Sequence, residues 1–349
     1  MFNETLANII PVKREKIDLA YNRLNSLTKP KGSLGRLEDI AARCAAILGI
    51  EKPSVTRKKF FVFAADHGVV EEGVSAYPAE VTELMVINML NEGAAINVLA
   101  KRVGAELELI DIGMGSDPVE AKFFIKRKVR AGTKNFATGP AMTSDEALAA
   151  ISVGIERAKK AVDSGFTMLG TGEMGIGNTS AASALITAYQ GIPIEQTVGP
   201  GTGLDSAGLQ NKINVLKRAL AINADKCTDP LSTLAALGGL EIAGICGLCL
   251  GAAANKCIVV VDGFTSSAGA LAAIRMCPDV KDYLFFSHMS AEPGHRFFFD
   301  SLGLIPILNL GMRLGEGTGA AIAMQIIEDA IAVYNEMATF EDAGIIPGA

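Results

Sequence analysis

The chain has 349 residues, of which 49% are hydrophobic and 6% aromatic, with 37 glycines and no tryptophan. This composition suits a layered α/β protein of one or two domains and excludes a disordered or repetitive chain. The formal net charge of −6 argues against nucleic acid as a partner, so an anionic substrate has to be held by local donors.

Cysteine usage and the start of the chain predict reduced thiols and a cytoplasmic location. Met1 and the residues after it lack the basic and apolar regions of a signal peptide, and the six cysteines are scattered. Cys246 and Cys249 form a CxxC pattern inside the apolar stretch 242–254, which is too short to cross a bilayer and is predicted to be a buried helix. No second cysteine pair or histidine pair completes a metal site. We therefore expect no metal and no membrane association.

The first 50 residues are predicted to be helical. Residues 13–21 and 36–47 carry apolar side chains at helical spacing. Residues 28–35 lie between them and contain Pro30, Gly32 and Gly35, which predicts a loop. Its composition favours an ordinary connector with solvated lysines.

From residue 58 onward, short β-rich runs alternate with helical ones, which predicts parallel strands joined by crossover helices. The expected strands are 59–65, 106–112, 166–170, 257–261, 283–286 and 306–310. The expected helices are 81–102, 144–164, 180–189, 209–223, 232–254, 267–276 and 317–340.

Polar and glycine-rich segments follow each of the six expected strands. They begin at Asp66, Asp111, Gly170, Asp262, Ser287 and Gly311. Because the carboxyl ends of parallel strands meet at one edge of a sheet, we expect these segments to line a single cleft.

Glu316 lies between Gly315 and Gly317, where the last expected strand gives way to a long apolar helix. A lone carboxylate held by glycines at the carboxyl edge of a sheet is a candidate general base. The alternative is a glutamate in the first helical turn that is merely stabilised by the helix dipole.

The richest glycine loop, residues 170–180, follows a strand and opens a helix with Asn178, Thr179 and Ser180 near its start. Free backbone N–H groups and the positive end of a helix dipole form an anion site there. The alternative is a tight turn with an ordinary helix cap.

The segment Gly170–Gly175 also matches the GxGxxG dinucleotide pattern, and Glu195 follows at the spacing of a ribose-binding acid. No convincing second strand ends in Glu195, which weakens this match. There is no GxxxxGK[ST] motif, which disfavours a P-loop nucleotidase.

Three further features are ambiguous from the residues alone. Lys212 follows a second glycine loop and is either a phosphate partner or a surface lysine. Ser75 and Tyr77 either face a ligand or fix their loop. His288 and His295 are expected to make structural hydrogen bonds, since no GxSxG elbow accompanies the serines near them.

Eight segments, in chain order and spread over nearly the whole chain, resemble the nicotinate-nucleotide:dimethylbenzimidazole phosphoribosyltransferase family. These segments are 29–37, 65–69, 73–78, 172–180, 198–203, 262–264, 287–295 and 314–319.

The resemblance implies a Rossmann-like parallel sheet flanked by helices, with a smaller helical part built from the chain ends, and a homodimer. We expect residues 1–55 and 317–349 to form the helical part and residues 56–316 the α/β catalytic domain. The implied reaction transfers phosphoribose from nicotinate mononucleotide to 5,6-dimethylbenzimidazole or a related base. It yields α-ribazole 5′-phosphate and nicotinate for the lower ligand of cobalamin, inverts the anomeric carbon, and needs no cofactor.

The resemblance also implies roles for individual residues. Glu316 corresponds to the catalytic base and Glu173 to a second active-site acid. The implied phosphate- and ribose-binding residues are Gly175, Ile176, Gly177, Asn178, Thr179, Ser180, Gly203, Lys212 and Ser290. The implied base-binding residues are Ser75, Tyr77, Met85 and Leu314.

Two functions from other classes remain open at this point. One is an NAD(P)-dependent oxidoreductase that uses the Gly170–Gly175 loop. The other is a nucleotide-binding module without catalysis, which would bind ligand but release no nicotinate.

Overall fold

A single parallel sheet organises the molecule, as seen in the computed structural model, which describes residues 1–118, 121 and 123–346. Within these residues the sheet has six strands in the order β3-β2-β1-β4-β5-β6, all paired in parallel. The strands are β1 (Lys58–Ala65), β2 (Glu106–Gly113), β3 (Phe124–Lys126), β4 (Met168–Met174), β5 (Ile258–Val261) and β6 (Leu284–Phe286). This is the doubly wound Rossmann order, so the predicted fold class is confirmed.

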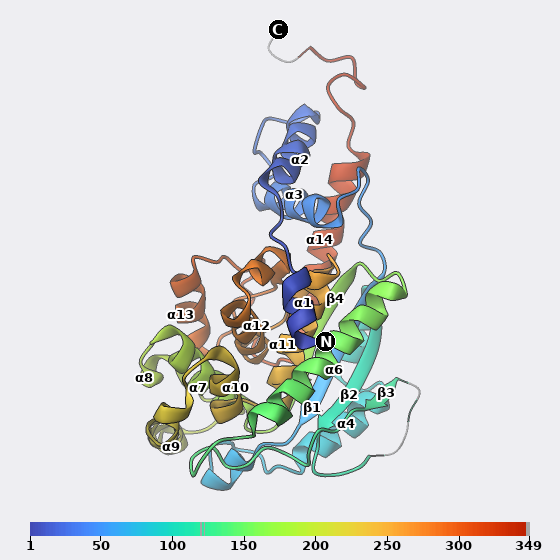
Figure 1. Cartoon of the computed structure of the whole chain (residues 1–349). Coiled ribbons are helices and arrows are strands. Elements are labelled where there is room, and N and C mark those ends of the chain that lie inside the picture. The colour runs from blue at the N-terminus through green and yellow to red at the C-terminus, as the bar shows by residue number, and fades with distance from the viewer. Residues whose placement is uncertain (119–120, 122, 347–349) are drawn as a thin grey trace.

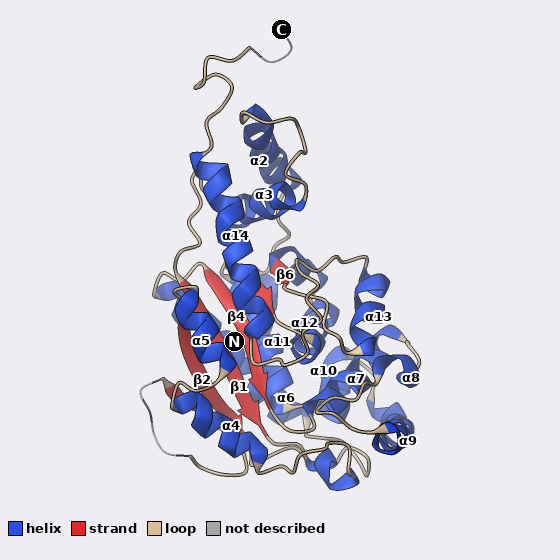
Figure 2. Cartoon of the chain, turned by 180° about the vertical axis from the view of Figure 1, so that it is seen from behind, coloured by secondary structure: helices blue, strands red, loops and turns tan. Residues whose placement is uncertain are grey.

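Helices cover both faces of the sheet. Helices α6, α11 and α12 lie on one face, and α4, α5 and α14 lie on the other, which is the near face in Figure 2. The helices of the described residues are α1 (Phe2–Asn8), α2 (Arg14–Ser26), α3 (Arg36–Leu48), α4 (Val81–Leu90), α5 (Ala95–Arg102), α6 (Ser144–Asp163), α7 (Asn178–Gln190), α8 (Ile194–Thr197), α9 (Ser206–Asn223), α10 (Pro230–Leu237), α11 (Leu240–Ala254), α12 (Phe264–Met276), α13 (Pro293–Leu302) and α14 (Thr318–Glu336). Three short 3-10 helices are η1 (Gly68–Glu72), η2 (Ala224–Lys226) and η3 (Pro278–Tyr283).

Helices α2 and α3, from the N-terminal part of the chain, and the C-terminal helix α14 lie together at one end of the molecule (Figure 1). Helix α3 packs against α2 and α14, and the Arg23 side chain donates to the carbonyl of Tyr334 at 2.8 Å. An isolated bridge pairs Leu27 with Thr339. Helix α1 instead contacts α6 and α11 beside the sheet. The division into residues 1–55, 56–316 and 317–349 stays a prediction.

Two predicted strands need correction. The predicted strand 166–170 begins instead at Met168 and continues to Met174, so Glu173 lies on the strand rather than in the loop after it. The predicted strand 306–310 is wrong, because only Leu308 makes a bridge, to His288. Pro306 has no N–H to donate, and the segment is partly exposed, which explains why no ladder forms.

Two long predicted helices are each interrupted. The expected helix 81–102 breaks into α4 and α5 where Glu92 takes a φ of 58° before Gly93. The expected helix 232–254 breaks into α10 and α11 at Gly238 and Gly239, both of which have extended backbone. The sequence pattern reveals neither break, because the residues on both sides of each one are still apolar. Helix α13 lies outside the predicted helices, since a Pro-Gly pair at its start is typical of loops.

The core lies between the sheet and the helices on both faces. Phe60, Phe61 and Phe63 of β1 are fully buried. Cys246 and Cys249 are buried and unbonded in α11, as the apolar stretch predicted. In the part of the chain that is described, no helix is long and apolar enough to span a membrane.

Candidate active site

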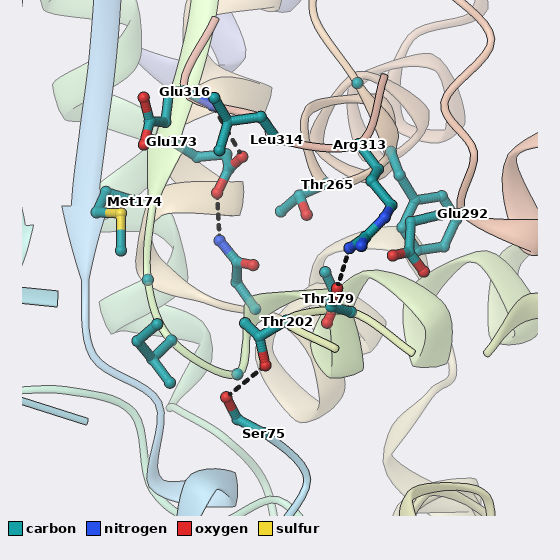
Figure 3. Close-up of a pocket in the computed structure, with 18 of the residues that line it drawn as sticks. Ser75, Glu173, Met174, Thr179, Thr202, Thr265, Glu292, Arg313, Leu314 and Glu316 are labelled. Atoms are coloured by element: carbon teal, nitrogen blue, oxygen red, sulfur yellow. Dashed lines mark hydrogen bonds between the residues drawn. The ribbon is translucent and has the colours of Figure 1, made fainter. Parts of the chain in front are cut away.

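A cavity of about 500 Å³ opens at the carboxyl edge of the sheet, where β1 and β4 lie side by side and the winding direction reverses (Figure 3). In doubly wound folds this switch point is where ligands bind. Its walls come from loops that follow β1, β4, β5 and β6 and from the segment before α14. The single cleft expected from the strand ends is therefore present in part: the segment that begins at Asp111, after β2, does not line it, and the last segment enters it without a preceding strand.

Glu316 lies immediately before helix α14, and its backbone has an unusual conformation. Its φ of 65° is left-handed, and Gly315 and Gly317 on either side have φ of 85° and 100°. A Cβ on Gly172 of β4 would lie 2.5 Å from the Glu316 carbonyl oxygen, so only glycine allows this close approach. Glu316 therefore lies outside the first turn of α14, contrary to the structural alternative considered for it.

Asp262, at the end of β5, fixes the start of α14. Its Oδ2 accepts the N–H of Gly317 at 3.0 Å and its Oδ1 accepts that of Ala320 at 2.9 Å. One carboxylate thus caps the helix from a neighbouring strand and holds the residue next to Glu316.

The side chain of Glu316 is 5% exposed and lines the cavity, and its Oε2 has no hydrogen-bond partner among the described residues. Burial raises the pKa of Glu316 to about 7, and the negative charge of Asp262 adds to this rise. A carboxylate with such a pKa and a free oxygen is suited to act as a general base near neutral pH.

Glu173 faces the same cavity from β4 (Figure 3). The amide of Asn178 donates to its Oε2, and the backbone N–H of Glu316 lies 3.4 Å from its Oε1. Burial, and next the charge of Asp262, raise the pKa of Glu173 well above its usual value. The two glutamates predicted to be catalytic are thus neighbours, and of the two it is Glu316 that keeps an oxygen without a hydrogen-bond partner among the described residues.

The turn after β4 leads directly into α7. Gly177 is the N-cap of this helix with a φ of 92°, and a Cβ there would meet Val70 at 2.7 Å. Gly175, Ile176, Gly177, Asn178 and Thr179 line the cavity. The positive end of the α7 dipole faces the cavity, which suits this turn, hereafter the anion turn, to a negatively charged group. Ser180 lies behind the wall, fully buried with its Oγ unpartnered among the described residues.

Lys212 of α9 is fully buried and not a surface lysine. Its Nζ donates to Thr179 Oγ1 at 2.9 Å and to the Gly199 carbonyl at 3.3 Å. Burial lowers the pKa of Lys212 to about 8, although the charge of Glu292 opposes this fall. The lysine thus stands directly behind the anion turn. Gly203, by contrast, is exposed and outside the cavity wall.

The cavity wall also has many apolar side chains and takes in all four predicted base-binding residues. Ser75, Tyr77, Met85 and Leu314 line it. Further apolar lining residues are Val74, Val81, Met174, Ile176 and Phe264. Ser75 is fixed by a 3.1 Å contact of its Oγ with Thr202 Oγ1. An apolar slot of this kind fits a flat aromatic ring.

The histidines differ in their roles. The Nδ1 of His295 accepts from the Ser290 N–H at 2.9 Å, and its Nε2 lies 3.0 Å from Ser267 Oγ. His295 therefore makes the structural hydrogen bonds that were expected, and it holds Ser290 in the cavity wall. His288 lines the cavity, and its Nδ1 has no partner among the described residues.

Several cavity residues were not singled out from the sequence as site residues. They are Thr202, Thr265, His288, Glu292 and Arg313, together with Asp262 behind Glu316. All of them follow the strand ends or flank the glycine segments already noted. The sequence places them at the carboxyl edge of the sheet, which marks them as candidates. Their residue types alone do not distinguish them from ordinary loop residues.

The dinucleotide alternative does not fit this geometry. Gly170 and Gly172 lie within β4, whereas the fingerprint glycines form the turn after the first strand. Glu195 lies in the short helix α8 and pairs with Lys217. Gly170 and Gly172 are instead the places where Met324 of α14 and the Glu316 backbone come close to β4.

Comparison with known proteins agrees with this site. A family model described as phosphoribosyltransferase matches residues 9–345. The nicotinate-nucleotide–dimethylbenzimidazole phosphoribosyltransferase of Pelodictyon phaeoclathratiforme is 54% identical over 97% of this chain and 96% of its own. The enzyme of the same name from Geobacter sulfurreducens is 51% identical over 100% and 99%. The crystal structure of CobT from Thermus thermophilus has a TM-score of 0.92 and 46% identity, covering 96% of this chain and 100% of that one.

Fold, cavity and family model together define a phosphoribosyltransferase. More narrowly, the chain belongs to the nicotinate-nucleotide–dimethylbenzimidazole phosphoribosyltransferase family. The relatives give no support to the oxidoreductase alternative.

Proposed function

We propose that this enzyme transfers the 5-phosphoribosyl group from nicotinate mononucleotide to 5,6-dimethylbenzimidazole or a related base. One ring nitrogen of the base attacks the anomeric carbon, and the bond from that carbon to the pyridinium nitrogen breaks. Nicotinate leaves with the bonding electron pair. The second ring nitrogen of the base loses its proton to Glu316, so that charge and atoms balance.

The observation that carries this proposal is that Glu316 and the anion turn face one cavity. Glu316, residues 175–179 and the apolar side chains that suit an aromatic base all line it. A phosphate held at the start of α7, with Lys212 behind it, keeps the anomeric carbon next to the base. Fixing two reactants in this way supplies a large share of the acceleration of a bimolecular transfer.

The departure of nicotinate needs no general acid. A pyridinium is already positively charged, so its departure needs no proton. The carboxylates can therefore act on the incoming base, with Glu316 accepting the proton and Glu173 orienting the Glu316 backbone. Attack from the face opposite nicotinate inverts the anomeric centre and gives the α-nucleotide.

The direct test is incubation with nicotinate mononucleotide and a panel of bases, followed by mass and chiral analysis of the products. We expect α-ribazole 5′-phosphate and an equal amount of nicotinate from 5,6-dimethylbenzimidazole. Release of nicotinate that is independent of any base, or binding without release, would point to hydrolysis or to a non-catalytic module instead.

Two further expectations complete the proposal. We expect a homodimer, which is supported by exposed apolar side chains outside the cavity, such as Leu84 at 62% and Val98 at 57%. Light scattering should give twice the chain mass of 36.5 kDa, and a monomer at micromolar concentration would refute the dimer. We also expect the enzyme to act in the cytoplasm, which cell fractionation can test.

A further inference from the structure

Glu292 is a buried carboxylate in the cavity that the reaction outlined above does not use. It precedes helix α13, is 4% exposed and lines the cavity. In Figure 3 it lies with Arg313 on one side of the cavity, and Glu173 and Glu316 lie on the other. Its Oε2 has no hydrogen-bond partner among the described residues.

The surroundings of Glu292 hold its carboxylate in place. Its backbone N–H donates to Ser290 Oγ at 3.3 Å. A Cβ on Gly199 would collide with Oε2, so the carboxylate needs a glycine beneath it. The groups of opposite charge that face it are Lys212 on α9 and Arg313 before α14. Burial raises the pKa of Glu292, and these two cations oppose the rise.

A carboxylate at this position is unexpected on electrostatic grounds. The α7 terminus lines the same cavity and Lys212 stands behind it, and both attract a phosphate, whereas Glu292 repels one. A buried carboxylate oxygen without a donor is also costly. The arrangement is therefore best explained by a donor that arrives with the substrate.

The chemistry of the carboxylate limits what this donor can be. An ionised carboxylate only accepts hydrogen bonds. The phosphate dianion and the nicotinate carboxylate offer no hydrogen, whereas the ribosyl ring offers the hydroxyls at C2′ and C3′. The anomeric carbon belongs to that ring and the phosphate is attached to it through C5′, so the ring must lie next to the anion turn.

We propose that Glu292 binds a ribosyl hydroxyl of the donor nucleotide and thereby selects ribosyl over deoxyribosyl substrates. This inference rests on the proposed phosphoribosyl transfer for the identity of the donor. It assigns one wall of the cavity to sugar recognition, distinct from the anion turn and from the aromatic slot.

A second role for Glu292 makes a different prediction. If it acted only as a negative charge that keeps Lys212 protonated, its loss would weaken every phosphorylated substrate alike. The loss would also become more severe as the pH rises toward about 8, because the pKa of Lys212 would fall further. Sugar recognition instead predicts an effect that depends on the hydroxyl and is present over the whole pH range.

The experiment compares nicotinate mononucleotide with its 2′-deoxy and 3′-deoxy analogues. Both binding, by calorimetry, and kcat/KM are measured for the wild type and for Glu292→Gln. We expect the wild type to prefer the ribosyl donor over one deoxy analogue by about 10- to 100-fold, the range for a hydrogen bond to a charged group. In Glu292→Gln this ratio should fall to within about threefold of unity, with little change for that deoxy analogue.

Two further variants test whether the preference for the ribosyl donor arises from the position of the Glu292 carboxylate. Glu292→Asp keeps the charge near Lys212 but shortens its reach, so it should lose the sugar preference as well. Glu156→Gln removes a half-exposed carboxylate of α6 that pairs with Arg127, and it should keep the preference of the wild type.

Three outcomes overturn the inference. They are a wild type that does not discriminate among the three donors, a Glu292→Gln variant with the wild-type ratio, and an equal loss on all donors that grows with pH. The binding arm keeps the inference separate from the proposed function. If the enzyme discriminates among the donors in binding but transfers none of them, sugar recognition stands and the proposed reaction is refuted. If it transfers the donors without discriminating among them, the proposed reaction stands and sugar recognition is refuted.

Discussion

Glu316 combines a strained backbone with a buried, unpartnered carboxylate oxygen. A left-handed conformation costs a residue with a side chain about 1 kcal/mol or more relative to the right-handed one. The two N–H bonds accepted by Asp262 hold the chain in this conformation. Strain that is held in this way points to function, because an unconstrained loop would relax.

At the residue scale we predict the pH dependence of the reaction. Since burial and the charge of Asp262 raise the pKa of Glu316 to about 7, the ionised base becomes more abundant as the pH rises through that value. The kcat/KM of the wild type should therefore increase from about pH 6 toward pH 8, and it should fall at higher pH as Lys212 loses its charge. Steady-state rates measured across this range in buffers of constant ionic strength check the profile.

The matched variant is Glu316→Gln, which keeps the size of the side chain and removes the base. We expect kcat to fall by about 100-fold or more and the rising limb near pH 7 to disappear. Circular dichroism should show an intact fold. Near-normal turnover in this variant, or a flat wild-type profile, would rule out Glu316 as the base.

Two helices present their N-terminal ends to the cavity region. Helices α7 and α14 both follow a glycine N-cap in the left-handed region, Gly177 and Gly317. At α14 the carboxylate of Asp262 accepts two N–H groups of this end. At α7 no side chain caps the helix, and we propose that the substrate phosphate binds there.

A second pair of elements supports the sheet from behind. Helices α6 and α11 pack closely because glycines face each other across their contact. A Cβ on Gly154 of α6 would collide with the Gly244 carbonyl and lie 2.5 Å from the Leu248 nitrogen. Since both neighbours are backbone atoms, neither can move aside cheaply.

At the element scale we predict that Gly154→Ala destabilises the protein by about 2 kcal/mol or more, because the two helices must separate. Gly139→Ala is the control, since an added methyl there has no neighbour within 4 Å. It should change the free energy of unfolding by less than about 0.5 kcal/mol. Urea denaturation measures both, and equal stability of the two variants would contradict the packing argument.

The whole molecule is acidic, with a formal net charge of −6, yet its proposed substrate is anionic. Attraction therefore comes from a small region in which the start of α7, Lys212 and Arg313 converge. The parallel sheet makes this possible, because it brings loops from distant parts of the sequence to one edge. The helices of the chain ends pack together at one end of the molecule, and the proposed boundaries of a separate domain there remain a prediction.

At the scale of the whole molecule we predict that the donor nucleotide stabilises the fold. Nicotinate mononucleotide at 100 times its Kd should add about 2.7 kcal/mol to the free energy of unfolding, raising Tm by about 4 °C. Nicotinate riboside lacks the phosphate, so at the same concentration it should give a smaller shift. Scanning fluorimetry reads both shifts.

The variant Lys212→Met tests whether this difference arises at the anion turn. Without the lysine charge, the nucleotide and the riboside should give similar shifts. A wild type in which the two ligands stabilise equally would show that the phosphate is not held there.

The sequence by itself determined the alternation of strands and helices, the edge at which polar segments gather, and the glycine segments around Glu173 and Glu316. These follow from local periodicity and from the need for glycine at left-handed turns. Only the tertiary structure decided that Glu173 lies on a strand, that residues 306–310 form none, and that Asp262 supports Glu316. It likewise decided that Lys212 is buried and that Glu292 faces the cavity with a free oxygen. The physical reason is that burial, helix capping by a distant side chain, and the pKa of a carboxyl group depend on neighbours far apart in the chain, which no local pattern records.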